Sequence, residues 1–213
     1  MVRRTFGEAT IKAVVILYAT REGQTRRIAE HLAKMLRAHD CAVDVLDVAQ
    51  DSPTAFDLAR YAAAIVASPV HIGKHERSVV AFVKKHRAQL HRIPCTFLSV
   101  SLSHAGAVDP NATAERRRSA AANVQKMIAE FLRQTGWKPT RVHPVAGALL
   151  YRQYGVVIRL MMLFIARLVG TSTDTTRDHE YTDWREVEAF AAELAESVNG
   201  AARSPAFAAS PGS

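Results

Sequence analysis

The chain contains little cysteine and few aromatic residues. Its two cysteines, Cys41 and Cys95, each lie in an apolar, strand-like run. This pattern provides neither a disulfide framework nor the paired ligands of a zinc site, so we expect no metal and a reducing, cytoplasmic compartment. Aromatic residues make up 7% of the chain and are not interleaved with the basic residues. The sequence therefore argues against a stacking surface for nucleic acid.

Long apolar runs and acidic residues are also scarce. No run of about 20 uncharged apolar residues is present, so no helix is expected to span a bilayer. Residues 1–11 start with basic residues but lack the apolar core of a secretory signal, and we expect them to form a tail. Lys and Arg outnumber Asp and Glu by 28 to 20, which gives a formal charge of +8. A basic chain favours anionic partners.

Strand-like and helix-like segments alternate along the rest of the chain. Five apolar segments predict strands: IKAVVILYAT, CAVDVLDV, YAAAIVASPV with a turn at Ser68-Pro69, IPCTFLSVSL and RVHPVAGALL. Helical periodicity predicts helices over 24–39, 76–90, 113–135 and TDWREVEAFAAELAESV, whose first turn Thr182 or Asp183 can cap. This alternation predicts an α/β domain over 12–198, with a parallel sheet covered on both faces. Residues 199–213, rich in Ala, Ser, Pro and Gly, are expected to be a disordered tail.

The turn after the first strand has the composition of an anion-binding loop. It reads TREGQT, Thr20 to Thr25, and leads directly into the first helix. Backbone N–H groups and the helix dipole attract phosphate at such a place, and Gly23 permits close approach of the backbone. The loop matches neither the P-loop nor the GxGxxG pattern. It can offer hydroxyl, amide and guanidinium donors from Thr20, Arg21, Gln24 and Thr25; the alternative is an ordinary capped turn.

Polar residues also follow the third and fourth strands. The third strand ends in Ser68, Pro69, Val70, His71, Ile72 and Gly73, and the fourth ends in Ser99, Val100, Ser101, Leu102, Ser103 and His104. Because the carboxyl ends of parallel strands meet at one edge of a sheet, we expect the three loops to form one ligand site. The alternative for His71 and His104 is a solvated loop histidine.

Four segments resemble one family closely. LYATREGQTRRIAEHLA, FVKKH, VAGALLYRQY and TDTTRDHEYTDWREVEAFA are similar to segments of the menaquinone-dependent protoporphyrinogen IX dehydrogenases, which are flavodoxin-like FMN proteins. The resemblance implies a three-layer, doubly wound fold with strand order 2-1-3-4-5 and a helical insertion over about 151–181. It also implies an FMN enzyme that oxidises protoporphyrinogen IX to protoporphyrin IX and passes the electrons to a membrane quinone.

The resemblance assigns two binding regions, and residue types suggest further roles. Residues 20–25, Glu22 included, would bind the FMN phosphate, and the stretch 99–151 would contain contacts to the flavin ring. His71 or His104 could act as a base. Arg152 and Arg177 could bind carboxylates of the porphyrinogen, because each carries a planar guanidinium fork. Lys74 could do the same, because it follows the third strand in the predicted ligand site.

Two segments depart from the family pattern. SPVHIGKH lacks an aromatic residue and an arginine of the family, and SHAGAVDPNATAERRR also differs. These departures keep open an alternative: a flavodoxin-like FMN quinone reductase or electron-transfer protein with a different substrate. A simple electron shuttle of this fold is typically acidic, which the charge of +8 disfavours. A binding module without a cofactor is a third class, which a colourless purified protein would identify.

The segment 154–170, YGVVIRLMMLFIARLVG, is apolar apart from arginines that share one arc of a helical wheel with Arg152. It either packs against the protein or a second subunit, giving a homo-oligomer, or lies in a lipid interface. Because porphyrinogen and quinone are apolar, the resemblance favours peripheral contact with the inner face of the cell membrane. A second basic cluster lies in 71–92, where residues 84–87 are expected to be a solvated helix face.

Overall fold

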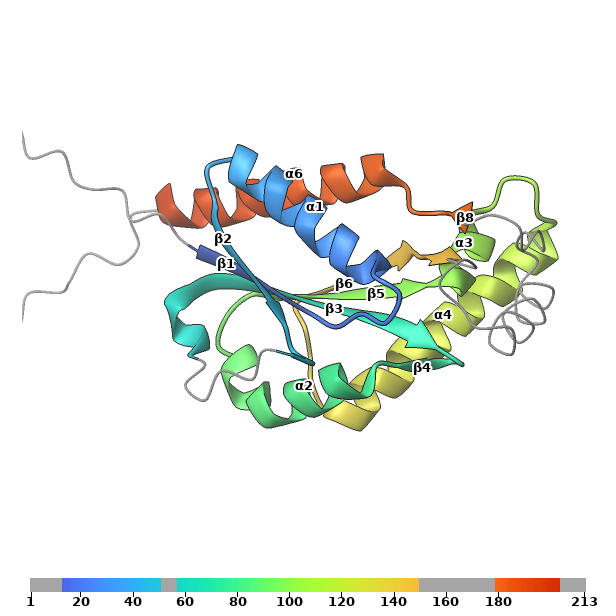
Figure 1. The fold of residues 1–213 in the computed structure, drawn as a ribbon, viewed down its shortest axis with the longest axis horizontal. Helices are drawn as coiled ribbons and strands as arrows, with labels where there is room; N and C mark the ends of the chain where they lie inside the picture. The colour runs from blue at the N-terminus through green and yellow to red at the C-terminus, as the bar shows by residue number, and fades with distance from the viewer. Residues whose placement is uncertain (1–12, 51–56, 150–178, 204–213) are drawn as a thin grey trace, which may run out of the picture.

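The central sheet contains five parallel strands. A computed structural model describes residues 13–50, 57–149 and 179–203. The strands are β1 (Ala13–Tyr18), β2 (Ala42–Asp47), β3 (Tyr61–His71), β5 (Cys95–Ser101) and β6 (Arg141–Ala146). They lie in the order β2-β1-β3-β5-β6 (Figure 1). Without the two-residue β4 (Lys74–His75), this is the predicted order 2-1-3-4-5, so the predicted fold is confirmed.

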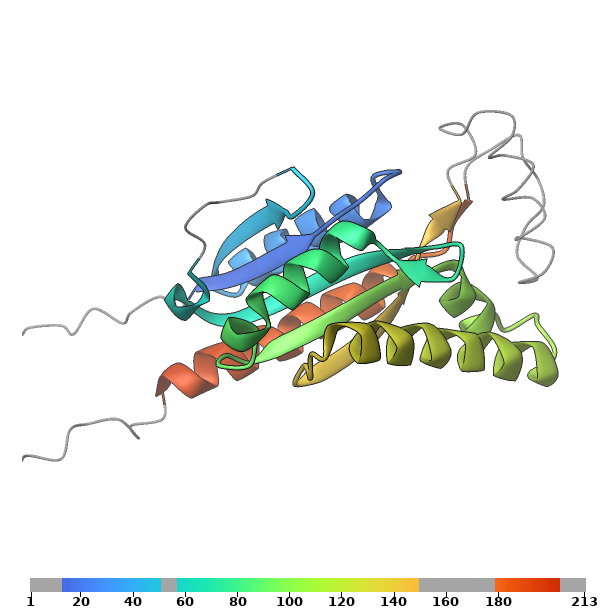
Figure 2. The ribbon, with the colours of Figure 1, turned by 90° about the horizontal axis from the view of Figure 1, so that it is seen from below.

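Helices cover both faces of the sheet. α1 (Gln24–Ala38) and α6 (Trp184–Arg203) lie on one face, and α2 (Arg77–Leu90) and α4 (Ala114–Thr135) lie on the other, as Figures 1 and 2 show. A short 3-10 turn, η1 (Leu58–Arg60), precedes β3, and α3 (Leu102–Val108) follows β5. The predicted cap of α6 is present, because the Asp183 carboxylate accepts hydrogen bonds from the backbone N–H groups of Arg185 and Glu186.

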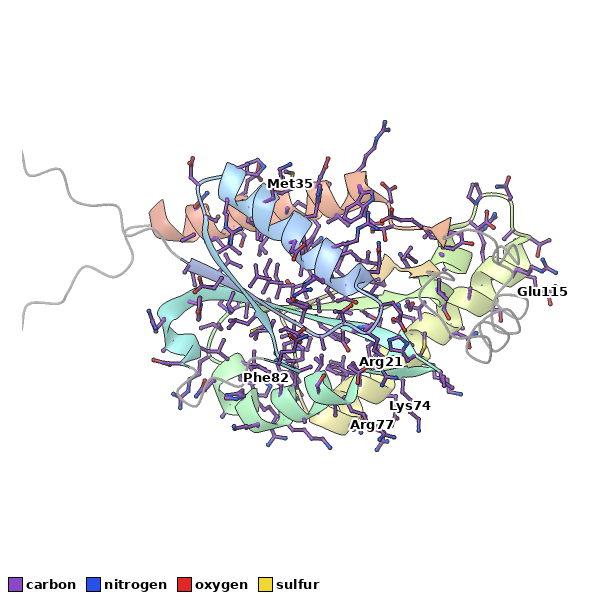
Figure 3. The ribbon with its side chains drawn as sticks, in the orientation of Figure 1. Arg21, Met35, Lys74, Arg77, Phe82 and Glu115 are labelled. Carbon is purple, nitrogen blue, oxygen red and sulfur yellow. The ribbon has the colours of Figure 1, made fainter. Side chains whose placement is uncertain are left out.

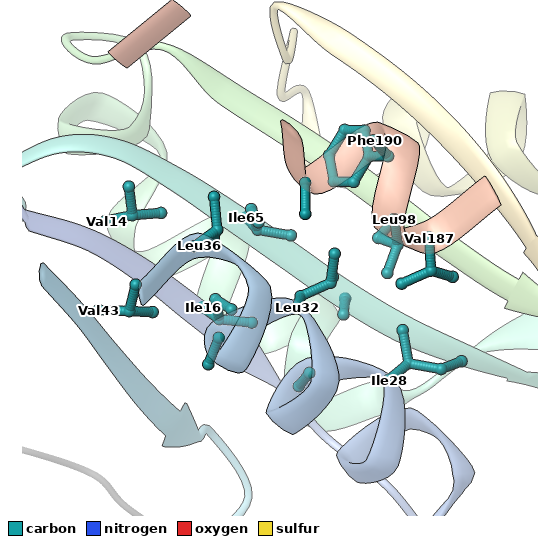
Figure 4. Close-up of a cluster of buried hydrophobic side chains, with 14 of the residues drawn as sticks. Val14, Ile16, Ile28, Leu32, Leu36, Val43, Ile65, Leu98, Val187 and Phe190 are labelled. Carbon is teal, nitrogen blue, oxygen red and sulfur yellow. The ribbon is translucent and has the colours of Figure 1, made fainter. Parts of the chain in front are cut away.

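Each face of the sheet has its own apolar core. Successive side chains of a strand point to opposite faces, so Ile16 packs under α1 and α6 whereas Leu17 packs against α2 and α4. Figure 4 shows the first core, where Leu32 and Phe190 lie over the sheet. In the second core the rings of Phe97 and Phe131 stack. A sheet buried on both faces explains the almost continuous apolar strands of the sequence.

The third strand differs from the prediction. The turn predicted at Ser68-Pro69 is absent, because β3 continues to His71 and turns at Ile72-Gly73 into β4. Pairing of β3 with β1 ends at Ala67, so the missing N–H of Pro69 removes no bond to that strand. The Pro69 carbonyl accepts a hydrogen bond from the Glu76 N–H.

Other boundaries differ as well. The sequence did not predict α3. This helix forms over residues 102–108 because Ser101, the last residue of β5, caps its first turn. α6 extends past residue 198 to Arg203, so the first residues of the predicted tail are helical. β7 (Ala148–Leu149) pairs antiparallel with β8 (His179–Glu180). This pairing closes the base of the predicted insertion.

Several predictions fall on residues that the structure does not describe. They concern Arg152, Arg177, the segment 154–170, the tail 1–11 and most of the tail 199–213. Within the described ranges, no helix combines the length and apolarity needed to cross a membrane.

Candidate functional site

A small pocket lies where the strands end at their carboxyl edge. Its space is 40 Å³, and the loops after β1, β3 and β5 meet there with the end of β6. Most of the residues that line it belong to the three predicted loops: Thr20, Glu22, Gln24, Thr25, Pro69, Val70, His71, Val100, Ser101 and Leu102. Gly147 and Ala148 complete the wall. The sequence placed these two only within the broad stretch 99–151, although a glycine just after a strand at this edge is a usable signal.

The N-terminus of α1 forms one side of the pocket and has no side-chain cap. Gly23 occupies the N-cap position with φ 89°, which strongly favours glycine. In contrast, α2, α3, α4 and α6 each begin with a side chain that accepts a hydrogen bond from a first-turn N–H. The first-turn N–H groups of α1 and the helix dipole are therefore directed at whatever occupies the pocket.

Hydroxyl groups supply further donors. Thr20 Oγ1 accepts a hydrogen bond from the Gly23 N–H at 2.9 Å, and Ser101 Oγ accepts one from the His104 N–H at 3.2 Å. In each case the oxygen acts as an acceptor, so the hydroxyl proton remains free to donate to a ligand. Thr25 lines the same pocket and is 1% exposed. Neutral donors and a helix N-terminus form a set that suits a phosphate.

Gln24 has another use in this structure. Its Nε2 donates to Glu180 Oε1 at 2.9 Å and to Thr182 Oγ1 at 2.8 Å, and Thr182 Oγ1 donates to the Ala146 carbonyl. Arg27 donates to Gln24 Oε1 and pairs with Glu180. The Gln24 amide thus ties β8 to α1 and β6, rather than pointing its donors at the predicted phosphate.

Arg21 and Glu22 point to different neighbours. Arg21 Nε lies 2.6 Å from Glu76 Oε2, outside the small pocket, and this hydrogen bond lowers the pKa of the Glu76 carboxyl. Glu22 Oε2 lies 3.4 Å from His71 Nε2 at the wall of the pocket. Burial lowers the pKa of His71, although the Glu22 charge opposes the shift. A neutral His71 can accept a proton at neutral pH.

The loop after β3 is a tight hairpin. Ile72 and Gly73 both have positive φ, 48° and 71°, as a two-residue type I′ turn requires. For a β-branched residue this conformation costs about 1–3 kcal/mol, yet Ile72 is 71% exposed. Neither residue lines the small pocket. Ser68 is fully buried, and its Oγ accepts a hydrogen bond from the Glu76 N–H, so it supports the hairpin and does not reach a ligand there.

Ser99 and the loop after β5 also differ from the prediction. Ser99 is fully buried, and its Oγ lies 2.9 Å from His75 Nε2. Burial lowers the pKa of His75 to about 4. Ser103 and His104 belong to α3 and do not line the pocket, and burial lowers the pKa of His104. Sequence reasoning missed His75, whose position four residues after His71 in a polar loop gave no sign of burial.

The fit of an FMN to this site is partial in the present geometry. The donors suit the phosphate, but 40 Å³ accommodates only a group of a few atoms. Pockets for whole cofactors are several hundred Å³ in size. A flavin ring would therefore need a wider space than the pocket has in this geometry. Within the described part of the chain, no cluster of three or more His, Cys, Asp or Glu side chains could hold a metal ion.

The chain is similar to known proteins in both sequence and fold. The flavodoxin domain family matches residues 15–176. A protoporphyrinogen IX dehydrogenase [quinone] of Escherichia coli is 32% identical over 85% of this chain and 93% of its own length. The Leishmania major protein of the same name is 32% identical over 85% of this chain and 74% of its own. A flavodoxin variant from Pseudomonas aeruginosa shares the fold, with TM-score 0.51 and 14% identity over 88% and 99% of the two chains. The chain belongs to the flavodoxin domain family.

Proposed function

We propose that this protein binds FMN and oxidises protoporphyrinogen IX to protoporphyrin IX, with a quinone as electron acceptor. The observation that carries the proposal is the match over 85% of the chain to dehydrogenases of that name, from a bacterium and from Leishmania major. The pocket at the carboxyl edge supports it, because its donors suit the phosphate of a flavin nucleotide. Membrane contact through 154–170 is part of the same proposal, since a membrane quinone is apolar.

When bound, FMN would supply two-electron redox chemistry, so the six-electron oxidation of protoporphyrinogen IX would need three rounds and three quinones. The protein binds and orients the reactants. Thr20, Thr25 and the first-turn N–H groups of α1 would hold the phosphate, and Val70 and Leu102, which line the same pocket, would contact the ring. The His71 Nε2 faces the Glu22 carboxylate at 3.4 Å, so a neutral His71 would accept a proton at its other ring nitrogen, Nδ1. His104, the other predicted base, lies on α3 outside the pocket.

An anaerobic assay tests this function. The FMN-loaded protein is mixed with protoporphyrinogen IX and a quinone, and porphyrin fluorescence is followed over time. We expect fluorescence to rise only when protein, FMN and quinone are all present. A yellow protein that reduces quinone with another donor but leaves the porphyrinogen unchanged would favour the alternative quinone reductase.

Replacing Thr25 with valine is expected to weaken FMN binding by about 1–3 kcal/mol, which is a factor of roughly 5 to 150 in Kd. Valine has the same shape as Thr25, which lines the pocket, but lacks its hydroxyl donor. The measurement is a titration that follows flavin fluorescence. Thr25→Ser, which keeps the hydroxyl, serves as the control. An unchanged Kd for Thr25→Val would place the phosphate elsewhere.

The membrane part of the proposal has a separate test. Replacing both Leu160 and Phe164 with aspartate puts charge into the apolar segment 154–170. We expect the variant to stay in the supernatant when anionic liposomes are sedimented, because charges resist immersion in the interface. FMN content serves as the control for folding. Continued co-sedimentation would favour packing of this segment on protein.

A further inference from the structure

A larger groove opens beside the β3–β4 hairpin. Its volume is 870 Å³, within the usual range of ligand-binding pockets. The hairpin, the first half of α2 and Gln134 at the end of α4 form its walls. His71 lines both this groove and the small pocket. A molecule in the groove would therefore lie next to one in the pocket.

The groove carries uncompensated positive charge. Lys74, Arg77 and Lys84 line it and are exposed, and none of them forms an ion pair with another described residue. The single carboxylate in the lining, Glu76, is already held by Arg21 at 2.6 Å. Figure 3 shows Arg21, Lys74 and Arg77 close together on the same side of the molecule.

The nearby Glu130 carboxylate on α4 does not neutralise the positive charge of the groove. The Glu130 carboxylate on α4 acts electrostatically on Lys74. It is bound by Arg133, whose Nη2 lies 2.7 Å from Glu130 Oε1. Glu76 and Glu130 are thus each bound by an arginine, and the groove cations remain available to an anion from solution.

An apolar surface accompanies the cations. Ile72, which is 71% exposed, lines the groove together with Val80 and Ala81. An exposed, conformationally strained isoleucine at the tip of a hairpin is unusual, and a strained residue is a reason to look for function. Cations beside apolar side chains match a ligand that has carboxylates on an apolar body.

We propose that this groove binds the substrate as an amphiphilic dicarboxylate. Protoporphyrinogen IX has this chemistry, since its two propionates extend from an apolar tetrapyrrole. Arg77, Lys84 and Lys74 bind the propionates, and Ile72 and Val80 contact the tetrapyrrole, with His71 between substrate and flavin. The inference rests on the proposed function and names the substrate site for it. It also gives Lys84 a ligand-binding role, whereas the sequence predicted only a solvated helix face for residues 84–87.

The test uses the double variant Arg77→Gln with Lys84→Gln. Protoporphyrin IX is titrated into FMN-loaded protein, and its fluorescence gives the Kd. We expect the Kd to rise about tenfold or more, because charge-assisted hydrogen bonds are lost, while FMN affinity stays unchanged. The matched control, Lys85→Gln with Arg92→Gln, removes two cations that do not line the groove and should bind as the wild type does. An equal loss in the control would overturn the proposal.

A neutral ligand gives a second, independent comparison. The dimethyl ester of protoporphyrin IX lacks the carboxylates, so wild type and the groove variant should bind it with the same Kd. Preferential binding of the ester by the wild type would contradict the assignment. If the groove variant instead loses binding to phosphatidylglycerol vesicles and keeps its porphyrin affinity, the groove faces lipid and the proposal is wrong. These titrations need no turnover, whereas failure of the proposed function would appear as a lack of quinone-dependent oxidation by the unmodified chain.

Discussion

Replacing Phe131 with alanine should lower the free energy of unfolding by about 3–5 kcal/mol, the usual cost of removing a buried phenylalanine ring. Phe131 is 2% exposed and stacks on Phe97, with ring centroids 4.2 Å apart and planes 8° apart. Its ring also meets the edge of Trp137 and contacts His75. The alanine variant would leave a cavity between α4 and the sheet that these rigid rings cannot fill.

Urea unfolding followed by circular dichroism measures this change. The matched control is Phe82→Ala on α2, because Phe82 is only partly buried at the edge of the same core. We expect the control to lose clearly less stability. Because Phe131 contacts His75 on β4, which lines the groove, the Phe131 variant should also bind porphyrin less tightly. A loss of stability no larger than that of Phe82→Ala would mean that α4 is packed differently.

Acid should weaken the folded state through His75. Burial lowers its pKa from 6.5 to about 4, so between these pH values the unfolded chain binds a proton that the folded chain excludes. Stability is therefore full above pH 6.5 and falls as the pH drops toward 4, by about 3 kcal/mol for a shift of this size. Protonation places a charge against the apolar rings of Phe97 and Phe131.

The variant His75→Gln isolates this contribution. It removes the titrating group and keeps a side chain that can bond to Ser99. Urea midpoints measured from pH 7 to pH 4 should fall less steeply for the variant than for the wild type. His39→Gln, a substitution of an exposed histidine, should leave the wild-type slope in place. Parallel slopes for His75→Gln and wild type would show that His75 does not contribute to the loss of stability in acid.

The sequence predicted the sheet well because its strands are apolar on both faces. β1 and β5 read as near-continuous apolar runs, and α1 shows a clear helical period through Ile28, Leu32 and Leu36. Local signals failed where tertiary contacts decide the backbone. Pro69 is typical of a turn, yet it continues a strand, because pairing with β5 persists after β1 has ended.

The site was predicted at the level of loops and less well at the level of atoms. Thr20, Thr25, His71 and Ser101 do line one pocket, since parallel strands bring their ends together. Ser68 and Ser99 look equally polar in the sequence, but both lie under the hairpin. Nothing in the local sequence shows that His75 contacts Ser99 or that the N–H of Glu76 binds Ser68.

The central claim is that the phosphate of FMN binds at the N-terminus of α1, and riboflavin tests it most directly because it has the same ring without the phosphate. Calorimetric titration of the protein with both flavins gives the contribution of the phosphate. We predict that FMN binds at least about a hundredfold more tightly than riboflavin, since several charge-assisted hydrogen bonds depend on the phosphate. We also expect Thr25→Val to narrow that ratio. Equal affinity for the two flavins, or a ratio that Thr25→Val leaves unchanged, would contradict the account.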